Sequence, residues 1–312
     1  MSIYGDDIAA LNEAYVDLLR SGETKKAEDI TSAFTRTRVR EDGNARRILP
    51  AEPVTRDDFV PQIDSDQPVL LVELEPDSPG AVVMPIGMSE PPAYYIKGKR
   101  YRVVLQRVSS PIMKKDMLEL ETYRADIRQL LGELIVKDLS WAEDATFIAS
   151  CNQLLGGSAG ATNILSGYVQ WHQLNGGISR VTVGDAFKLA FEPRSRIPVK
   201  TILTNAGTLA ELFKWERVEV GGDVAQDILF EGWGERPLNG ADIIASIKKE
   251  LIPTDTMFMF GDSRFIGKFY VYAEPTVELK KEMDTIYFRA KEVVGMAIGH
   301  GDGVFRFDFV TT

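Results

Sequence analysis

One apolar pattern in the middle of the chain constrains its fold more than any other feature. Between residues 120 and 148, apolar side chains recur in steps of three and four, the spacing that places them on one face of an α-helix. These side chains are Leu120, Tyr123, Ile127, Leu130, Leu134, Ile135, Leu139, Ala142, Ala145 and Ile148. The pattern predicts a helix of about 40 residues that ends at Gly156 and Gly157, a rod of about 60 Å. Such a length is more typical of a structural spine than of a helix in a globular enzyme.

The composition is that of a protein with room for two compact units. The chain has 312 residues, of which 44% are hydrophobic and 26% charged. Its 36 basic and 46 acidic side chains give a net charge of −10, which argues against a protein that coats nucleic acid with its whole surface. The N-terminus resembles neither a signal peptide nor a membrane span, so we expect cytosol-like conditions. The one cysteine, Cys151, is predicted to be a buried thiol.

The first 66 residues are predicted to form a short helix followed by an arm. Apolar residues at helical spacing predict an amphipathic helix over residues 6–19, closed by Ser21 and Gly22. Residues 23–66 lose this periodicity and contain several prolines, which indicates an extended arm rather than a packed domain. The arm carries five arginines: Arg36, Arg38, Arg40, Arg46 and Arg47.

A β-rich segment occupies residues 67–110. Two strand-like runs, VLLVELE and YYIKGKRYRVVLQRV, flank a stretch rich in proline and glycine, which predicts an extended hairpin over about residues 80–108. A two-stranded ribbon alone in water is marginally stable at best, so we expect this one to lie against another surface. Its polar and aromatic side chains include Tyr94, Tyr95, Lys97, Lys99, Arg100 and Arg102.

The rest of the chain mixes strands and helices. Residues 160–268 are predicted to form an α+β unit, with a buried strand in VKTILTN and a helix in AGTLAELFKWE. Residues 269–312 read as three strands and two turns, rich in β-branched and aromatic residues.

No motif in this chain predicts catalysis. The glycine-rich stretch GGSAGATN lacks the Lys-Ser/Thr pair that a phosphate-binding loop needs, and we expect it only to end the long helix. His172 and His300 stand far apart, and there is no HExxH, CxxC or GxSxG spacing. We therefore expect no catalytic residue, no cofactor and no metal site, and a structural role for each histidine.

The order of these parts resembles that of the major capsid proteins of tailed bacteriophages, which have the HK97 fold. Three segments carry the resemblance. EDATFIASCNQLLGGSAG is similar to the end of that family's spine helix, and KTILTNAGTLAELFKW to the strand-helix unit of its axial domain. PTVELKKEMDTIYFRAKEVVGMAIGHGDGVFRFDF is similar to the closing strands of its peripheral domain. The resemblance covers about residues 65–312.

The resemblance implies an α+β, HK97-type organisation. Its parts would be the N-terminal arm (1–66), the extended loop (67–110), the spine helix of the peripheral domain (111–159), the axial domain (160–268) and the terminal peripheral strands (269–312). It further implies a virion protein that is not an enzyme and that self-assembles in the host cytoplasm, as pentamers and hexamers, into an icosahedral shell. The hairpin would lie over a neighbouring subunit, and the five arm arginines would face the shell interior or bridge to acidic neighbours.

The resemblance also implies partners. These are a separate scaffolding protein, a portal, a possible cement protein and packaged double-stranded DNA held by non-specific contacts, with no membrane. Because only the short helix and the arm precede the loop, we expect no N-terminal cleavage. Two alternatives remain open: an encapsulin-like nanocompartment shell, which shares the fold, and an α+β enzyme, which would show a pocket with convergent titratable groups.

Some members of that family lock their shells with an isopeptide bond. In them a loop lysine joins an asparagine near the start of the long terminal strand of a neighbour, promoted by a buried glutamate. Lys97, Lys99 and Glu292 lie near the corresponding positions, but no asparagine follows Asn239 in this chain. We therefore expect a shell held by non-covalent contacts.

Overall fold

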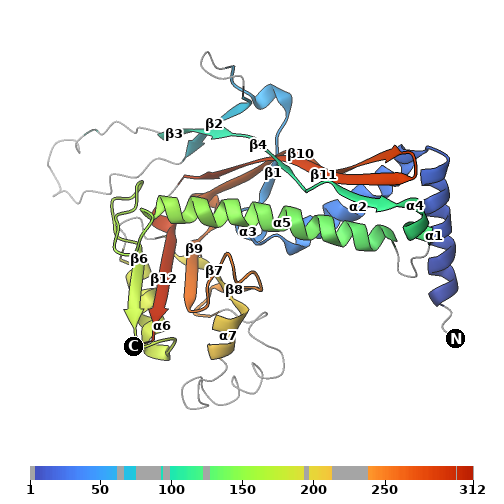
Figure 1. Ribbon diagram of the computed structural model, residues 1–312. Coiled ribbons are helices and arrows are strands. Elements are labelled where there is room, and N and C mark those ends of the chain that lie inside the picture. Colours follow the sequence, from blue (N-terminus) through green and yellow to red (C-terminus); the bar gives the residue numbers. More distant parts are fainter. Residues whose placement is uncertain are drawn as a thin grey trace, which may run out of the picture. The chain divides into compact units, whose positions relative to one another are not determined.

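The chain forms two compact units, which are described one at a time (Figure 1). The computed structural model describes residues 4–61, 67–74, 93, 99–121, 127–192, 197–212, 238–299 and 301–311. Unit 1 consists of Met1–Asp58, Leu105–Ser150 and Lys268–Met296, and unit 2 of Phe59–Val104, Cys151–Gly267 and Ala297–Thr312. Both units contain helices and strands, so the predicted α+β class is confirmed.

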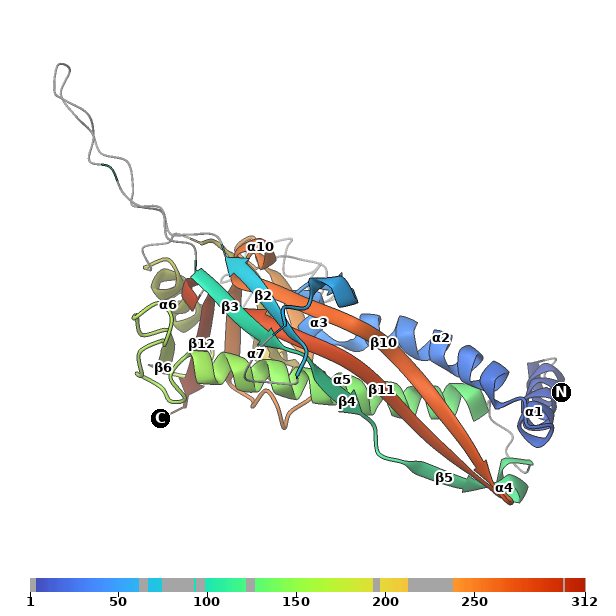
Figure 2. The same ribbon diagram turned by 90° about the horizontal axis from the view of Figure 1, so that it is seen from above.

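Unit 1 is built on a five-stranded sheet in the order β1-β10-β11-β4, with β5 paired to a further length of β11 (Figure 2). The strands are β1 (Ala51–Pro53), β4 (Gln106–Ser109), β5 (Met113–Asp116), β10 (Gly267–Glu282) and β11 (Thr285–Ile298). β1 runs parallel to β10, whereas β4 and β5 run antiparallel to β11. The two long strands, β10 and β11, are the first two of the three predicted terminal strands.

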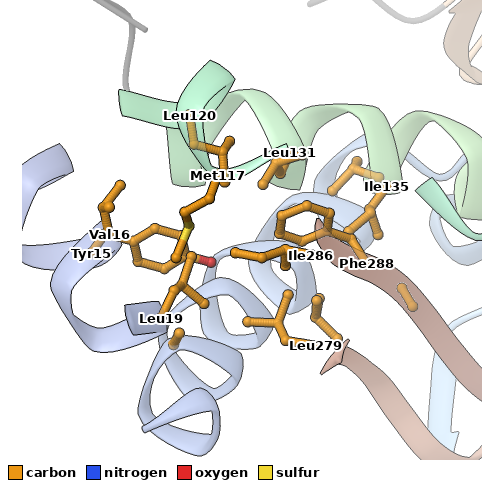
Figure 3. Packing of buried hydrophobic residues seen from close by; sticks show 14 of the residues in the cluster. Tyr15, Val16, Leu19, Met117, Leu120, Leu131, Ile135, Leu279, Ile286 and Phe288 are labelled. Atoms are coloured by element: carbon orange, nitrogen blue, oxygen red, sulfur yellow. The ribbon is translucent and has the colours of Figure 1, made fainter. Parts of the chain in front are cut away.

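Helices pack on one face of this sheet. They are α1 (Tyr4–Arg20), α2 (Thr24–Asp42), α4 (Met117–Glu121) and the unit 1 part of α5 (Ile127–Leu154). Alternate residues of the strands face them, so Val277, Leu279, Ile286 and Phe288 belong to one buried cluster with the apolar side chains of the helices. Figure 3 shows Phe288 of that cluster beside Leu131 and Ile135 of α5. The predicted apolar face contained Ile135 but not Leu131, and it was wrong at Leu130 and Leu134, which are exposed.

The predicted extended arm is wrong over residues 24–48, because that segment is helical. It forms α2 and the short helix α3 (Asn44–Ile48). The buried stripe of α2 is Ala27, Thr31, Thr35 and Val39, spaced four residues apart. Two of the four are threonines, whose hydroxyl groups donate to carbonyl groups one turn earlier, Thr31 to Ala27 at 3.0 Å and Thr35 to Thr31 at 2.8 Å. Because threonine is polar, a search for apolar residues at helical spacing does not detect this four-residue repeat.

The spine helix is shorter than predicted. α5 has 28 residues, which corresponds to about 42 Å at about 1.5 Å per residue. The apolar residues before it belong in part to α4, a separate helix of 5 residues. At its other end α5 stops beside Gly156, as predicted. Gly156 has a positive φ of 87°, and a Cβ atom there would lie 2.8 Å from the carbonyl oxygen of Thr162, so the turn requires glycine.

Unit 2 contains a second five-stranded sheet in the order β6-β12-β9-β7-β8. Its strands are β6 (Trp171–Asn175), β7 (Val199–Asn205), β8 (Asp242–Ser246), β9 (Thr256–Gly261) and β12 (Val304–Val310). Helices α6 (Arg180–Ala190) and α7 (Ala206–Leu212) contribute to its core. The predicted strand and helix at residues 199–216 are confirmed by β7 and, over its described length, by α7. The short elements of this unit are α10 (Ser263–Ile266) and η3 (Gly301–Gly303).

Two predicted boundaries are corrected by the strand pairing. β12 does not join β10 and β11, because it pairs with β6 and β9 in unit 2. The last strand of the chain therefore belongs to the other sheet. The hairpin is formed by β2 (Val69–Leu74) and β3 (Lys99–Val104), whereas the residues after Val104 enter the unit 1 sheet as β4. Strand-like sequence identifies strands but not the sheet that each one joins.

Candidate functional site

A buried group of three charged side chains joins the N-terminal segment of unit 1 to the α5 and β11 elements of the same unit. Arg46 of α3 lies between Glu143 of α5 and Glu292 of β11, and we name these three residues the charge cluster. Arg46 Nε donates to Glu143 Oε2 at 2.9 Å, and its Nη2 donates to Glu143 Oε1 at 2.5 Å and to Glu292 Oε2 at 2.8 Å. The arginine side chain is 4% exposed and both glutamates are fully buried. The cluster therefore sits in a low-dielectric interior, where charge interactions are strong.

The segment around Arg46 is held by further polar contacts. Asp144, next to Glu143 on α5, accepts hydrogen bonds from the backbone N–H of Ala45 at 2.8 Å and from the side chain of Asn44 at 2.9 Å. It thereby satisfies backbone groups in the first turn of α3. The guanidinium of Arg46 also lies 5.1 Å from the centre of the Phe269 ring on β10. Two adjacent acids of α5 thus fix the whole of α3.

The charge cluster contains two carboxyl groups but only one guanidinium, and this imbalance shifts the pKa values of Glu292 and Arg46. Burial and the charge of Glu143 raise the pKa of Glu292 to about 9, although Arg46 acts in the opposite direction. Burial works against the charged form of Arg46, but the hydrogen bond and the charge of Glu143 outweigh it and raise the pKa of the guanidinium. Both shifts have the same physical origin, which is the burial of two carboxyl groups beside one guanidinium.

The edge of the unit 1 sheet beside β10 is covered by α2. Glu28, Ser32 and Arg36 follow one another at four-residue spacing on this helix. Glu28 and Ser32 accept hydrogen bonds from the backbone N–H groups of Leu279 at 2.8 Å and Val277 at 2.9 Å. Arg36 Nε donates to the carbonyl oxygen of Pro275 at 3.1 Å. The helix thus satisfies strand groups that would otherwise be open to another strand.

The five arm arginines do not form one surface. The five arginines were expected to face the shell interior or to bridge to acidic neighbours. For Arg46 the exposed inner face is wrong, because this side chain is buried in the charge cluster and bridges to Glu143 and Glu292 of its own chain. Arg36 is partly exposed, with its Nε 3.6 Å from a carboxylate oxygen of Glu274, and Arg47 is exposed. The side chains of Arg38 and Arg40 lie outside the described part of the structure.

The predicted loop residues are only partly covered by the structure. Tyr94, Tyr95 and Lys97 lie outside the described residues, as does the side chain of Lys99. Arg100 on β3 is exposed and forms an ion pair with Glu73 on β2 at 2.7 Å, and Arg102 is also exposed.

The described residues show no arrangement that indicates catalysis. They contain no group of three or more His, Cys, Asp or Glu side chains placed to hold a metal ion. His172 is half-buried and its ring stacks on Phe307 with centroids 5.7 Å apart; burial lowers its pKa. His300 lies outside the described residues. Cys151 is buried as predicted, and burial raises the pKa of its thiol, so it is no activated nucleophile.

A surface hollow of about 600 Å³ lies on unit 1 near Ile112, Glu278, Tyr287 and Arg289. Titratable groups with shifted pKa values, such as a carboxyl with a raised pKa, are common in enzyme sites. Hydrogen bonds from Lys291 and Arg289 instead lower the pKa of Glu278. None of the helices, over the residues that the structure describes, is both long and apolar enough to cross a lipid bilayer.

Three residues of unit 2 form a polar group that the sequence did not predict. Arg306 on β12 stacks on Trp171, with Cζ 3.9 Å from the ring centroid, and donates to Asp308 at 3.0 Å. The indole N–H of Trp171 donates to the same carboxylate at 2.6 Å. The alternation of β12 marks these side chains as one face of a strand, but only the parallel pairing with β6 brings Trp171 to them.

Comparison with known proteins identifies solved structures that have the same fold. No protein-family model matches the sequence, and no curated protein matches it. Solved structures do match. A chain from the capsid of a native GTA particle is 15% identical, with a TM-score of 0.55 over 85% of this chain and 89% of that chain. A chain from Mycobacterium phage Ogopogo is 13% identical, with a TM-score of 0.56 over 86% and 92%. A chain from the capsid of the cyanophage P-SCSP1u is 9% identical, with a TM-score of 0.53 over 85% and 87%.

These identities are too low to carry more than the fold, but the coverage is nearly complete on both sides. The chain has the α+β fold of these capsid chains, and the HK97-type fold predicted from the order of its segments is confirmed.

Proposed function

We propose that this protein is a major capsid protein that assembles into the icosahedral shell of a tailed phage or a related particle and encloses double-stranded DNA. The observation that carries the proposal is the match of both units, over 85% of the chain, to a chain from a particle capsid. The protein acts by assembly and not as an enzyme. Many modest contacts repeated by symmetry give a closed shell high avidity without any one strong bond.

The β2–β3 hairpin supports this proposal. It is a two-stranded sheet whose strands have 6 residues each, a size that is marginally stable alone. Leu71 is 42% exposed and Val104 40% exposed. A neighbouring copy of the chain would cover these side chains and stabilise the hairpin. Lys99, Arg100 and Arg102 on β3, together with Tyr94, Tyr95 and Lys97 next to it in sequence, would contact that neighbour.

The proposed partners follow from the proposed shell. They are a separate scaffolding protein, a portal and, on the outside, a cement protein. Of the described arm arginines, Arg47 is exposed and Arg36 is partly exposed, so both could make non-specific contact with packaged DNA. We assign Arg38 and Arg40 to the same role, whereas Arg46 has a structural role.

Electron microscopy of the purified protein tests the proposal. We expect closed shells or open pentamers and hexamers when the chain is expressed with its scaffolding protein. A variant in which residues 76–97 are replaced by a short glycine-serine linker keeps β2 and β3 but removes the loop, and it should give only soluble monomers or single capsomers. The proposal is overturned if the intact chain sediments at high concentration as a single 34.7 kDa species.

A further inference from the structure

The charge cluster carries an inference that does not depend on the proposed function. Its members have no balanced charge of their own, because two carboxyl groups share one guanidinium. With both glutamates ionised, the buried group would carry a net charge of −1. An isolated buried charge costs several kcal/mol, so the fold favours a state in which one carboxyl is neutral.

The geometry indicates which acid takes the proton. Arg46 makes a two-pronged contact with Glu143, in which both carboxylate oxygens accept hydrogen bonds. It makes a single contact with Glu292, through Oε2. Glu292 Oε1 is buried and has no hydrogen-bond partner among the described atoms. A bidentate arginine-carboxylate pair is the stronger of the two, so protonation of Glu292 disturbs the cluster least.

Among the described side chains, the surrounding charged groups do not neutralise the second acid. From α5 come Glu143 and Asp144, and Asp144 is already occupied by Asn44 and Ala45. From β10 comes Glu274, whose charge acts on Arg46 and adds further negative potential. The residue opposite Glu292 on β4 is the uncharged Val108. α3 contributes only Arg46, since Arg47 is exposed.

We propose that the charge cluster binds one proton, on Glu292, and that this proton controls how firmly residues 43–49 are held in unit 1. With the proton bound, α3 stays closed on α5 and β11. When the proton is lost, Arg46 must serve two buried carboxylates and α3 loosens. The ligand of this site is therefore a proton, and the element that responds is the link between α2 and β1.

The direction of the pH dependence follows from the shift. The pKa of Glu292 is raised from its ordinary value of 4.5 to about 9 in the folded protein. The folded state thus binds this proton more tightly than the unfolded state does. The stabilisation is fully present below pH 4.5 and is lost progressively as the pH rises to about 9, above which no more is lost.

Unfolding of the full-length chain by urea at a series of pH values tests the proposal. Glu292→Gln gives a neutral side chain of nearly the same shape. We expect the wild-type midpoint to fall between pH 5 and pH 9.5 by clearly more than that of Glu292→Gln. Glu282→Gln, an exposed glutamate of β10 outside the cluster, should keep the wild-type slope. Equal slopes for wild type and Glu292→Gln would overturn the proposal.

Two measurements on the wild-type chain keep the test decisive even if Glu292→Gln does not fold. The first is the infrared carbonyl stretch of a protonated carboxyl, which should be present at pH 7 and should disappear near pH 9. In a control variant, Glu143→Gln, this signal should be absent at pH 7, because Glu292 is then the one carboxylate paired with Arg46. Hydrogen exchange corrected for intrinsic rates should show about a tenfold loss of protection at Ala45 and Leu49 for each pH unit through which the cluster is titrated. Absence of the carboxyl signal at pH 7, or unchanged protection at pH 9.5, would show that no such proton is held.

Discussion

Arg46 and Arg47 are neighbours with the same side chain and opposite environments. The sequence places both in one basic run, and nothing local separates them. The contacts that bury Arg46 lie 97 residues away at Glu143 and 246 residues away at Glu292. A partner so distant in sequence cannot be deduced from charge pattern alone, which explains why the basic arm was predicted and the charge cluster was missed. Cys151 was predicted correctly because its burial follows from helical spacing.

The pair offers a matched test of the cluster. Arg46→Met leaves two buried carboxyl groups without a counter-charge, and we expect a loss of about 3–5 kcal/mol in the free energy of unfolding. Arg47→Met changes an exposed side chain and should remain within about 0.5 kcal/mol of wild type. Urea unfolding of both variants at pH 7 measures the difference. Equal stability of the two variants would show that the cluster is not a significant stabilising contact.

Gly267 in unit 2 has no room for a side chain, because the backbone of a neighbouring segment lies against its Cα atom. Its φ is 157°, and a Cβ atom would lie 1.9 Å from the carbonyl oxygen of Ala297. Because the obstacle is backbone and not a flexible side chain, we expect Gly267→Ala to prevent folding or to lower stability by more than about 4 kcal/mol. Gly184→Ala is the control, since Gly184 lies within α6 with nothing within 4 Å.

Gly184→Ala should stabilise the chain by about 0.5–1 kcal/mol through the better helix propensity of alanine. Soluble yield and thermal unfolding of the two glycine variants provide the comparison. Normal folding of Gly267→Ala would contradict the close approach of the two backbone segments.

At the scale of elements, α2 combines two tasks that the sequence conceals. One side carries a buried stripe interrupted by threonines, and another carries the side chains that cover the β10 edge. The periodic apolar signal is weak for this reason, whereas the longer run of apolar residues at helical spacing in α5 predicts a helix directly. The length of α5 was overestimated because the apolar spacing also includes residues of α4, which is a separate helix. Helices are identified from sequence when packing alone defines their inner face, and are missed when hydrogen bonding defines it.

The hydrogen bonds by which α2 covers the edge of β10 can be tested by removing one acceptor, the hydroxyl group of Ser32. Ser32→Ala removes the acceptor of the buried Val277 N–H, and an unsatisfied buried donor costs about 1–3 kcal/mol. We also expect faster hydrogen exchange at Val277 than at core amides of β11. Ser21→Ala is the control, because the Ser21 hydroxyl is exposed and donates only to the carbonyl of Leu18. An effect of equal size in both variants would mean that Ser32 does not protect the edge.

At the scale of the whole molecule, the order of elements was more informative than any motif. The hairpin, the spine helix, the α+β unit and the two long terminal strands occur in the predicted order, whereas the segment predicted as an extended arm is helical over residues 24–48. The sheet assignment of β12 could not be predicted, because alternation along a strand is the same whichever sheet it joins. The net charge of −10 excluded a general nucleic-acid coat but could not show where the chain's basic residues lie.

The proposed shell could be held together by non-covalent contacts alone or also by covalent links between subunits. The residues around Asp284 and Glu292 favour non-covalent contacts. The resemblance to tailed-phage capsid proteins implies that some relatives join a loop lysine to an asparagine of a neighbour. Here the turn between β10 and β11 offers Asp284 in place of an asparagine, and Asp284 is exposed. A carboxylate resists attack by an amine because its carbonyl carbon is electron-rich. Glu292, which lies near the position of the promoting acid, is hydrogen-bonded to Arg46 of its own chain.

We therefore expect a shell without covalent links between subunits. Mature particles boiled in detergent under reducing conditions should give one band at 34.7 kDa. The same sample from Asp284→Asn tests whether the acceptor alone is missing: we expect no ladder from this variant either, because Glu292 remains engaged with Arg46. A ladder of covalent multimers from wild type would contradict the non-covalent shell. A ladder from Asp284→Asn alone would show that the acceptor, and not the occupied glutamate, is what prevents the bond.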